Sequence, residues 1–382
     1  MLSNEDISVG YTQQDYGVTE SDTSISSTSA NGFKPLFKLY RHMPYEEFDE
    51  LCFDPELKPE SNTLLDPLFP ENYKQLHPND ISIATYPFST DGLSLLSGFI
   101  EASHSQIAMG SFSQCPATFE EITLKSVPGL RIYPGALPPD TQRQLLLNVI
   151  EEYLPPELHL TNLDPTYHIP KPFNLFAHPP DTAVLARSEN TSPTTFKALQ
   201  NKKLRWLTLG GQYDWTTKRY PTFEPNTKDF PKFPKSLWAF LSGESQIFKT
   251  SINPEASIIN FYSDGDILSP HQDVAEKSSA DLASISIGCE AVFFCGLSKD
   301  KMPLQIRVRS GDVIVMGGDS RFAWHGIGKV WQSTTPDYLA EFDYTANFDQ
   351  TDIDPQIAAG RQHYADWILN KRINLNIRQM LD

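Results

Sequence analysis

The chain has 382 residues, 39% of them hydrophobic and 21% charged, which is more than one typical domain but short for three. We therefore expect one large domain with an extension and enough apolar material for a sizeable core. No apolar run approaches the roughly eighteen residues of a membrane span, so a soluble protein without a membrane partner is expected.

The net charge of −17 opposes a nucleic-acid partner when taken alone, because affinity for phosphate comes from Lys and Arg. The charge is unevenly placed, however. Residues 1–66 hold thirteen acids and four bases, whereas residues 197–235 hold nine bases and three acids. Since local sign matters more than the total for a groove that meets phosphates, nucleic acid is not excluded.

The first segment, residues 1–33, is rich in Ser, Thr, Asn, Gly and Asp and predicts a disordered acidic tail. Its acids precede the first basic residue, Lys34, so no secretory or mitochondrial signal is apparent. The four cysteines show no CxxC spacing, which favours free thiols in a reducing compartment. These features predict a nuclear or cytoplasmic protein.

The next segment, residues 34–130, predicts an extension that wraps the main domain. It opens with aromatics and charges at helical spacing, broken at Pro44, and from residue 54 it is Pro-rich and irregular. A helix is then expected, with Asp140 as its N-cap and Pro155 at its end. After about Leu204, short β-rich runs separated by Gly, Pro and Asp predict a β-sandwich or jelly roll.

The first motif that carries chemistry is His271-Gln272-Asp273. Side chains two apart on a strand share a face, so this motif presents an imidazole and a carboxylate to one point. With His325 from a distant strand, it would form a two-His-one-carboxylate iron site with open positions. The pair alone is weak evidence, because chance supplies roughly one such motif in a chain of this composition, and a surface His beside a loop Asp is the alternative.

A second motif lies near the end of the chain, in residues 372–378. Polar and apolar side chains alternate strictly here, so Arg372, Asn374, Asn376 and Arg378 are expected on one face of a strand and the three aliphatic residues in the core. Two guanidinium groups on one strand face can close on a small dianion, because their planar forks bind carboxylates. A solvated strand face shows the same alternation and is the alternative.

At this point the chain resembles the AlkB dioxygenases, from about Gly129 to Gln379. The resemblance lies in NFYSDGDILSPHQD, SGDVIVMGGDSRFAWHG and RINLNIRQ, with 51 residues between Asp273 and His325. The stretches FKPLFKLYR and LRWLTLGGQYDWTTKRY are similar to the eukaryotic AlkB-homologue-one branch. The resemblance implies an α+β domain over 131–382 with a double-stranded β-helix (jelly roll) core flanked by helices.

The resemblance also implies Fe(II), 2-oxoglutarate as cosubstrate, and O2. The matching iron ligands are His271, Asp273 and His325. The positions that match the family's 2-oxoglutarate-binding set are Asn260, Tyr262, Arg372, Asn374 and Arg378.

Residues 197–235 are expected to form a basic nucleotide-recognition lid. Trp215 aligns with an aromatic residue of the family's lid, and aromatic side chains stack on flipped bases while Lys and Arg hold the backbone. The expected substrate contacts are Tyr213, Trp215, Lys218 and Arg219, although the two aromatics could instead be core residues. A departure lies two residues beyond Asp273, where the bacterial enzyme has an acid and this chain has Ala275, followed by Glu276.

The implied reaction is oxidative demethylation of N-methylated bases in RNA, such as tRNA, or in DNA, releasing succinate, CO2 and formaldehyde. We expect a monomer that acts on single-stranded nucleic acid or on a flipped base. One alternative is a 2-oxoglutarate oxygenase of protein side chains. A second is a non-catalytic binding module, which the intact ligand set disfavours, and a third is abasic-site lyase activity through Lys202 or Lys218.

Overall fold

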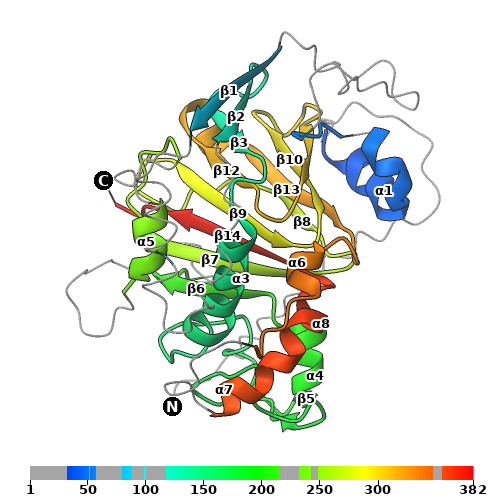
Figure 1. Cartoon of the computed structure of the whole chain (residues 1–382), viewed down its shortest axis with the longest axis vertical. Helices are drawn as coiled ribbons and strands as arrows, with labels where there is room; N and C mark the ends of the chain where they lie inside the picture. Colours follow the sequence, from blue (N-terminus) through cyan, green and yellow to red (C-terminus); the bar gives the residue numbers. More distant parts are fainter. Residues whose placement is uncertain are drawn as a thin grey trace, which may run out of the picture. The chain divides into compact units, whose positions relative to one another are not determined.

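The computed structural model describes residues 32–50, 52–56, 80–87, 99, 118–214, 220, 232–241, 248–346 and 355–381. Two antiparallel sheets face each other and form the expected jelly-roll core, with helices outside them (Figure 1). A two-stranded ribbon, β4 (Ala183–Val184) and β5 (Thr194–Thr195), lies apart from both sheets. In the described part of the chain, no helix is long and apolar enough to cross a membrane.

The major sheet has eight strands in the order β1-β2-β3-β12-β9-β14-β7-β6. Their bounds are β1 (Ile81–Pro87), β2 (Thr118–Leu124), β3 (Leu130–Tyr133), β12 (Val313–Met316), β9 (Leu282–Gly288), β14 (Lys371–Arg378), β7 (Ala256–Ser263) and β6 (Trp206–Gly210). The minor sheet has the order β11-β10-β13-β8. Its bounds are β11 (Leu304–Val308), β10 (Ala291–Gly296), β13 (Trp324–Val330) and β8 (Leu268–His271).

The alternation of β14 places its two faces in different environments. Ile373, Leu375 and Ile377 are fully buried and pack against helices on the outer face of the major sheet. Their polar neighbours face the space between the two sheets. The prediction from residues 372–378 is therefore confirmed, and the polar face is enclosed rather than solvated.

Helices cover the outer face of the major sheet and build the larger hydrophobic core with it (Figure 1). The helices of this core are α3 (Pro139–Leu147), the π-helical turn η4 (Asn148–Tyr153), α5 (Lys235–Leu241), α6 (Asp337–Ala340) and α8 (Tyr364–Ile368). Two short helices, α7 (Pro355–Gly360) and η8 (Arg361–His363), lead into α8. The predicted helix before Pro155 is present, but Asp140 as its N-cap is wrong. Pro138 is the N-cap, and Asp140 lies in the first turn, where it forms an ion pair with Arg143 at 2.5 Å.

The first part of the amino-terminal extension covers the outer face of the minor sheet. α1 (Lys34–His42) ends before Pro44, as expected, and is followed by η1 (Tyr45–Glu50). Phe33 is fully buried in the small core that α1 forms with the minor sheet, so the predicted tail 1–33 is too long at its end. Of that tail, residues 1–31 lie outside the described residues.

Two stretches expected to be an irregular extension and a lid have regular secondary structure instead. The supposedly irregular extension contributes β1 and β2 to the major sheet, because their alternating residues pair in register along their whole length. Residues 197–210 of the predicted lid belong to the scaffold as α4 (Phe196–Ala198), η5 (Leu199–Lys203) and β6. Leu207 and Leu209 are fully buried, which fixes this part to the sheet edge.

Candidate active site

A cavity of about 510 Å³ lies between the two sheets. Its apolar lining comes from both sheets and includes Ile258, Met316 and Phe293. Its polar lining comes mainly from β14 and from the segment that follows β8. Every residue proposed as an iron or 2-oxoglutarate ligand lines this one cavity: Asn260, Tyr262, His271, Asp273, His325, Arg372, Asn374 and Arg378.

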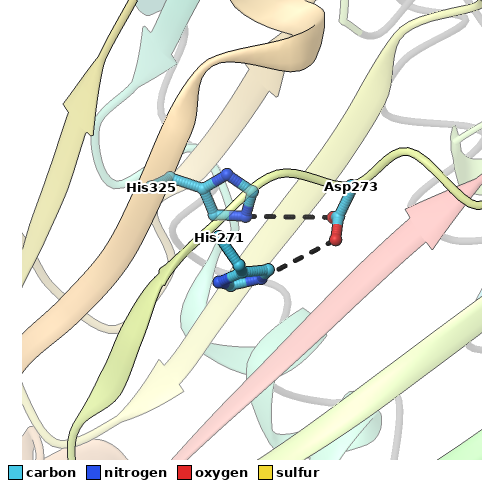
Figure 2. Close-up of side chains that lie close together, drawn as sticks. All are labelled: His271, Asp273 and His325. Atoms are coloured by element: carbon cyan, nitrogen blue, oxygen red, sulfur yellow. Dashed lines mark ion pairs between the residues drawn. The ribbon is translucent and has the colours of Figure 1, made fainter. Parts of the chain in front are cut away.

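The side chains of His271, Asp273 and His325 converge (Figure 2). One ligand atom from each lies within 4.8 Å of the others. The Asp273 carboxylate is 3.7 Å from His271 Nε2 and 3.8 Å from His325 Nε2. Two imidazoles and one carboxylate are a donor set that suits Fe(II) and leaves coordination positions open, so these residues fit the metal.

Strand pairing explains how the two histidines meet. β8 and β13 are antiparallel neighbours, and His271 lies directly opposite His325. Directly opposite residues share a face, and the two ring centroids are 4.4 Å apart. The next residue, Gly326, allows the strands to approach, because a Cβ there would lie 2.5 Å from the Leu268 carbonyl oxygen.

Backbone carbonyls orient both rings. His271 Nδ1 lies 3.0 Å from the Ser269 carbonyl oxygen, and His325 Nδ1 lies 3.0 Å from that of Ala323. Since a carbonyl can only accept, each Nδ1 carries the proton and each Nε2 offers its lone pair to a metal. Burial, reinforced by His271, lowers the pKa of His325 to about 4, which keeps this imidazole neutral and able to bind a metal.

Positive charge surrounds Asp273. Burial alone would raise the pKa of this carboxyl, but Arg378 first, and then the two imidazoles and Arg321, hold the pKa well below its usual range. Arg378 Nη2 and Asn376 Nδ2 lie 3.3 Å and 3.2 Å from Asp273 Oδ2. Asp273 is therefore an ionised ligand held from one side by β14.

Arg372 lies on the same strand face and is buried. Its Nη2 donates to Ser286 Oγ at 2.9 Å, and its guanidinium carbon lies 5.3 Å from the centre of the Tyr262 ring. Among the described residues, its Nε and Nη1 have no hydrogen-bond partner. A buried guanidinium with two free donors fits the carboxylate of a small dianion, so the residues present also fit 2-oxoglutarate.

Neighbouring strands hold Arg372 and Asn374 in place. Asn374 lies opposite Asn260 on β7 and donates to Ser284 Oγ on β9 at 2.7 Å. Sequence reasoning missed Ser284 and Ser286, although the alternation of polar and apolar residues over 283–287 places both serines on one face. Burial raises the pKa of Tyr262 to about 12, so its hydroxyl keeps its proton.

The expected substrate contacts are only partly described. Tyr213 lines the cavity, and its ring lies 5.4 Å from that of Tyr220. Trp215, Lys218 and Arg219 lie outside the described residues. Ala275 also lines the cavity, so the position that departs from the bacterial pattern faces this space with a methyl group.

Comparisons with known proteins agree with this geometry. The family model of the 2OG-Fe(II) oxygenase superfamily matches residues 129–378. The N6-methyladenosine RNA demethylase ALKB1 of Pyricularia oryzae is 34% identical over 285 residues, 66% of this chain and 75% of that protein. The N6-methyladenosine RNA demethylase ALKBH of Cryphonectria parasitica is 35% identical over 228 residues, 56% of this chain and 92% of that protein. The tRNA demethylase abh1 of Schizosaccharomyces pombe is 34% identical over 269 residues, 68% of this chain and 81% of that protein.

Proposed function

The chain belongs to the AlkB-type proteins of the 2OG-Fe(II) oxygenase superfamily, and from this premise we propose that it oxidatively demethylates N-methylated bases in RNA, including tRNA, or in DNA. One observation carries the proposal. A two-His-one-Asp cluster lines the same cavity as a buried arginine, two of whose donors have no partner among the described residues.

In this proposal His271, Asp273 and His325 hold the iron. Arg372 binds the far carboxylate of 2-oxoglutarate, and Tyr262, Asn260 and Asn374 complete that end of the cavity. Bound Fe(II), with O2 and 2-oxoglutarate, supplies oxidation of an N-methyl group to a hydroxymethyl group while 2-oxoglutarate becomes succinate and CO2. The hydroxymethyl group then leaves as formaldehyde, and the base nitrogen regains its proton.

The protein's own contribution is positioning and exclusion of water. Carbonyl contacts fix both imidazoles, and Ser286 fixes Arg372, so the ligand groups need little rearrangement when they bind. The apolar walls of the cavity limit water around the reacting methyl group.

Nucleic acid is the proposed substrate because two further features favour it. Lys197, Lys202, Lys203 and Arg205 are exposed around η5 and the start of β6, which gives a basic patch on a strongly acidic protein. Tyr213 at the cavity offers an aromatic ring to a base. The relatives named above act on methylated RNA by their names, which agrees with this class of substrate.

The two rival activities need different experiments to distinguish them from nucleic-acid demethylation. An oxygenase of protein side chains would share the iron and 2-oxoglutarate site and differ only in substrate. A lyase acting through Lys202 would use a residue on η5 that is absent from the cavity lining, and it would survive chelators.

The direct test is incubation with methylated single-stranded RNA and DNA, and separately with a methylated histone peptide, in the presence of Fe(II) and 2-oxoglutarate. Nucleoside mass spectrometry, formaldehyde and succinate are measured together. The proposal expects demethylated base, formaldehyde and succinate in equal amounts from an oligonucleotide, and none after chelation. Turnover of the peptide alone would contradict it.

A further inference from the structure

Four buried charged side chains form a cluster beside the proposed iron site: Asp273, Glu276, Arg321 and Arg378. Two are anions and two are cations, so the cluster is formally neutral. The side chain of Glu276 is fully buried, and those of Arg321 and Arg378 are 2% and 4% exposed. A buried arrangement of this kind is costly unless every charge has a partner.

Glu276 is the member that joins the two arginines. Its Oε1 accepts from Arg378 Nη1 at 2.8 Å, and its Oε2 lies 3.3 Å from Arg321 Nη2. Each arginine also reaches Asp273. Arg378 Nη2 lies 3.3 Å from Asp273 Oδ2, and Arg321 Nη1 donates to the Asp273 carbonyl oxygen at 2.9 Å. Glu276 thus contacts both arginines that lie beside Asp273, but not Asp273 itself.

The two contacts of Arg378 are unequal. Its distance to Glu276 is that of a normal charge-assisted hydrogen bond, whereas its distance to Asp273 is longer than the roughly 2.7–2.9 Å typical of such bonds. The shorter hydrogen bond of Arg378 is thus the one to Glu276. This matters because Arg378 and a metal ion would compete for the same carboxylate oxygens.

From this geometry we propose that Glu276 is a positioning residue that keeps Asp273 available to the metal by dividing Arg378 between two carboxylates. This inference rests on the iron site of the proposed function. Without the charge of Glu276, Arg378 closes on Asp273, and metal affinity falls. Direct contact of Glu276 with a substrate base is disfavoured, because its side chain is fully buried and does not line the cavity.

The test is titration of metal-free protein with Co(II) alone, followed by the visible absorption of the bound ion, on the wild type and on Glu276→Gln. Glutamine keeps the size of the side chain and removes its charge. We expect Co(II) affinity to fall by about tenfold or more, the usual effect of losing a residue that supports a metal ligand. Unchanged Co(II) affinity in Glu276→Gln would overturn the inference.

A matched control variant distinguishes the proposed positioning role of Glu276 from the general effect of removing a buried charge. Glu151 forms a bidentate pair with Arg361, both bonds at 2.8 Å, and both side chains are buried to a similar degree. Glu151→Gln therefore removes a comparable buried charge at a site outside the cavity lining. It should lower the thermal unfolding temperature like Glu276→Gln and leave Co(II) affinity unchanged. An equal loss of affinity in both variants would overturn the inference.

A second pair of variants covers the case in which Glu276→Gln does not fold. Arg321→Gln alone is compared with Glu276→Gln/Arg321→Gln, which loses one charge of each sign. The double variant should bind Co(II) more weakly than Arg321→Gln, and equal binding would contradict the inference. If the wild type itself bound no Co(II), the metal site of the proposed function would be contradicted. If the wild type bound Co(II) and the variants without Glu276 bound it with unchanged affinity, only the role of Glu276 would be contradicted.

Discussion

Arg372 is a buried cation that the protein itself only partly satisfies. Burial lowers the pKa of its guanidinium, and two of its nitrogens lack partners among the described residues. A buried, incompletely hydrogen-bonded charge destabilises a fold unless a ligand completes it. Its presence on the strand face that lines the cavity is therefore better explained by ligand binding than by stability.

This reasoning predicts opposite effects of Arg372→Met on stability and on function. Affinity for 2-oxoglutarate should fall about 100-fold or more, because the far carboxylate loses its partner. The ligand-free variant should unfold at the same or a higher temperature, since it no longer buries an unsatisfied charge. Calorimetric titration with 2-oxoglutarate and thermal unfolding without it measure the two effects, and a large loss of ligand-free stability would refute this explanation.

At the same scale, His271, Asp273 and Arg372 belong to a short motif or to an alternating strand, and the sequence predicted them. His325 lies at the interval that the resemblance to the AlkB family implies. Glu276 and Arg321 have no such pattern, because they are charged residues 45 positions apart whose pairing depends on how the segment after β8 packs against η6 (Gly318–Phe322). Nothing local marks them as partners.

Among the elements, the contact between β8 and β13 determines the distance between the two histidines. Gly326→Ala should lower both the unfolding temperature and Co(II) affinity, because the added Cβ meets the Leu268 carbonyl oxygen and forces the strands apart. Gly328→Ala is the control. It lies on the same strand, but its Cβ would meet the Phe294 ring on the outer side, so it should lower stability and spare metal binding. Equal loss of Co(II) affinity in both variants would contradict this account of the strand pair.

Lys371, at the start of β14, is a buried cation whose titration makes the free energy of unfolding depend on pH. Its Nζ donates to the Asn201 carbonyl oxygen and, at 2.7 Å, to Ser263 Oγ. Burial lowers the pKa of Lys371 from 10.5 to about 8. Between these values the unfolded chain holds the proton that the folded protein has lost, so the free energy of unfolding from this group rises with pH.

The expected slope is at most about 1.4 kcal/mol per pH unit, reached midway between the two pKa values. Chemical denaturation of the wild type and Lys371→Met between about pH 8 and pH 10 measures it. The free energy of unfolding of the wild type should rise relative to that of Lys371→Met, which lacks the titrating group. If the free energies of unfolding of the wild type and of Lys371→Met changed in parallel with pH, Lys371 would not cause the pH dependence.

The element type was predictable from sequence where the alternation was strict, as in β14. The strands β1 and β2 were missed because Pro-rich neighbours hide their alternation. The first part of the predicted lid forms η5 and β6 instead. Its exposed lysines suggested a lid, but the buried Leu207 and Leu209 fix it to the sheet.

For the molecule as a whole, the distribution of charge matters more than its sum. The basic patch around η5 belongs to the rigid scaffold, and Lys203 donates to the Tyr167 hydroxyl at 2.6 Å. A rigid cationic surface outside the cavity lining can bind the phosphate backbone of a nucleic acid whose target base enters the cavity.

Charge reversal tests whether the basic patch binds the phosphate backbone. Lys202→Glu/Lys203→Glu should weaken binding to single-stranded RNA by about tenfold or more at low salt and reduce its salt dependence. Lys299→Glu/Lys301→Glu makes the same change of charge on the exposed turn between β10 and β11 and should have a smaller effect. Fluorescence anisotropy over a range of salt concentrations measures both, and equal effects would mean that only the total charge matters.

The central claim is that one cavity binds a metal through His271, Asp273 and His325 and a keto-dicarboxylate through Arg372. The most direct measurement is anaerobic equilibrium dialysis with Fe(II) and 2-oxoglutarate on the wild type, His325→Ala and Arg372→Met. We predict one iron and one 2-oxoglutarate per wild-type chain, loss of both in His325→Ala, and loss of 2-oxoglutarate with iron retained in Arg372→Met. Full occupancy by both in His325→Ala would contradict the claim.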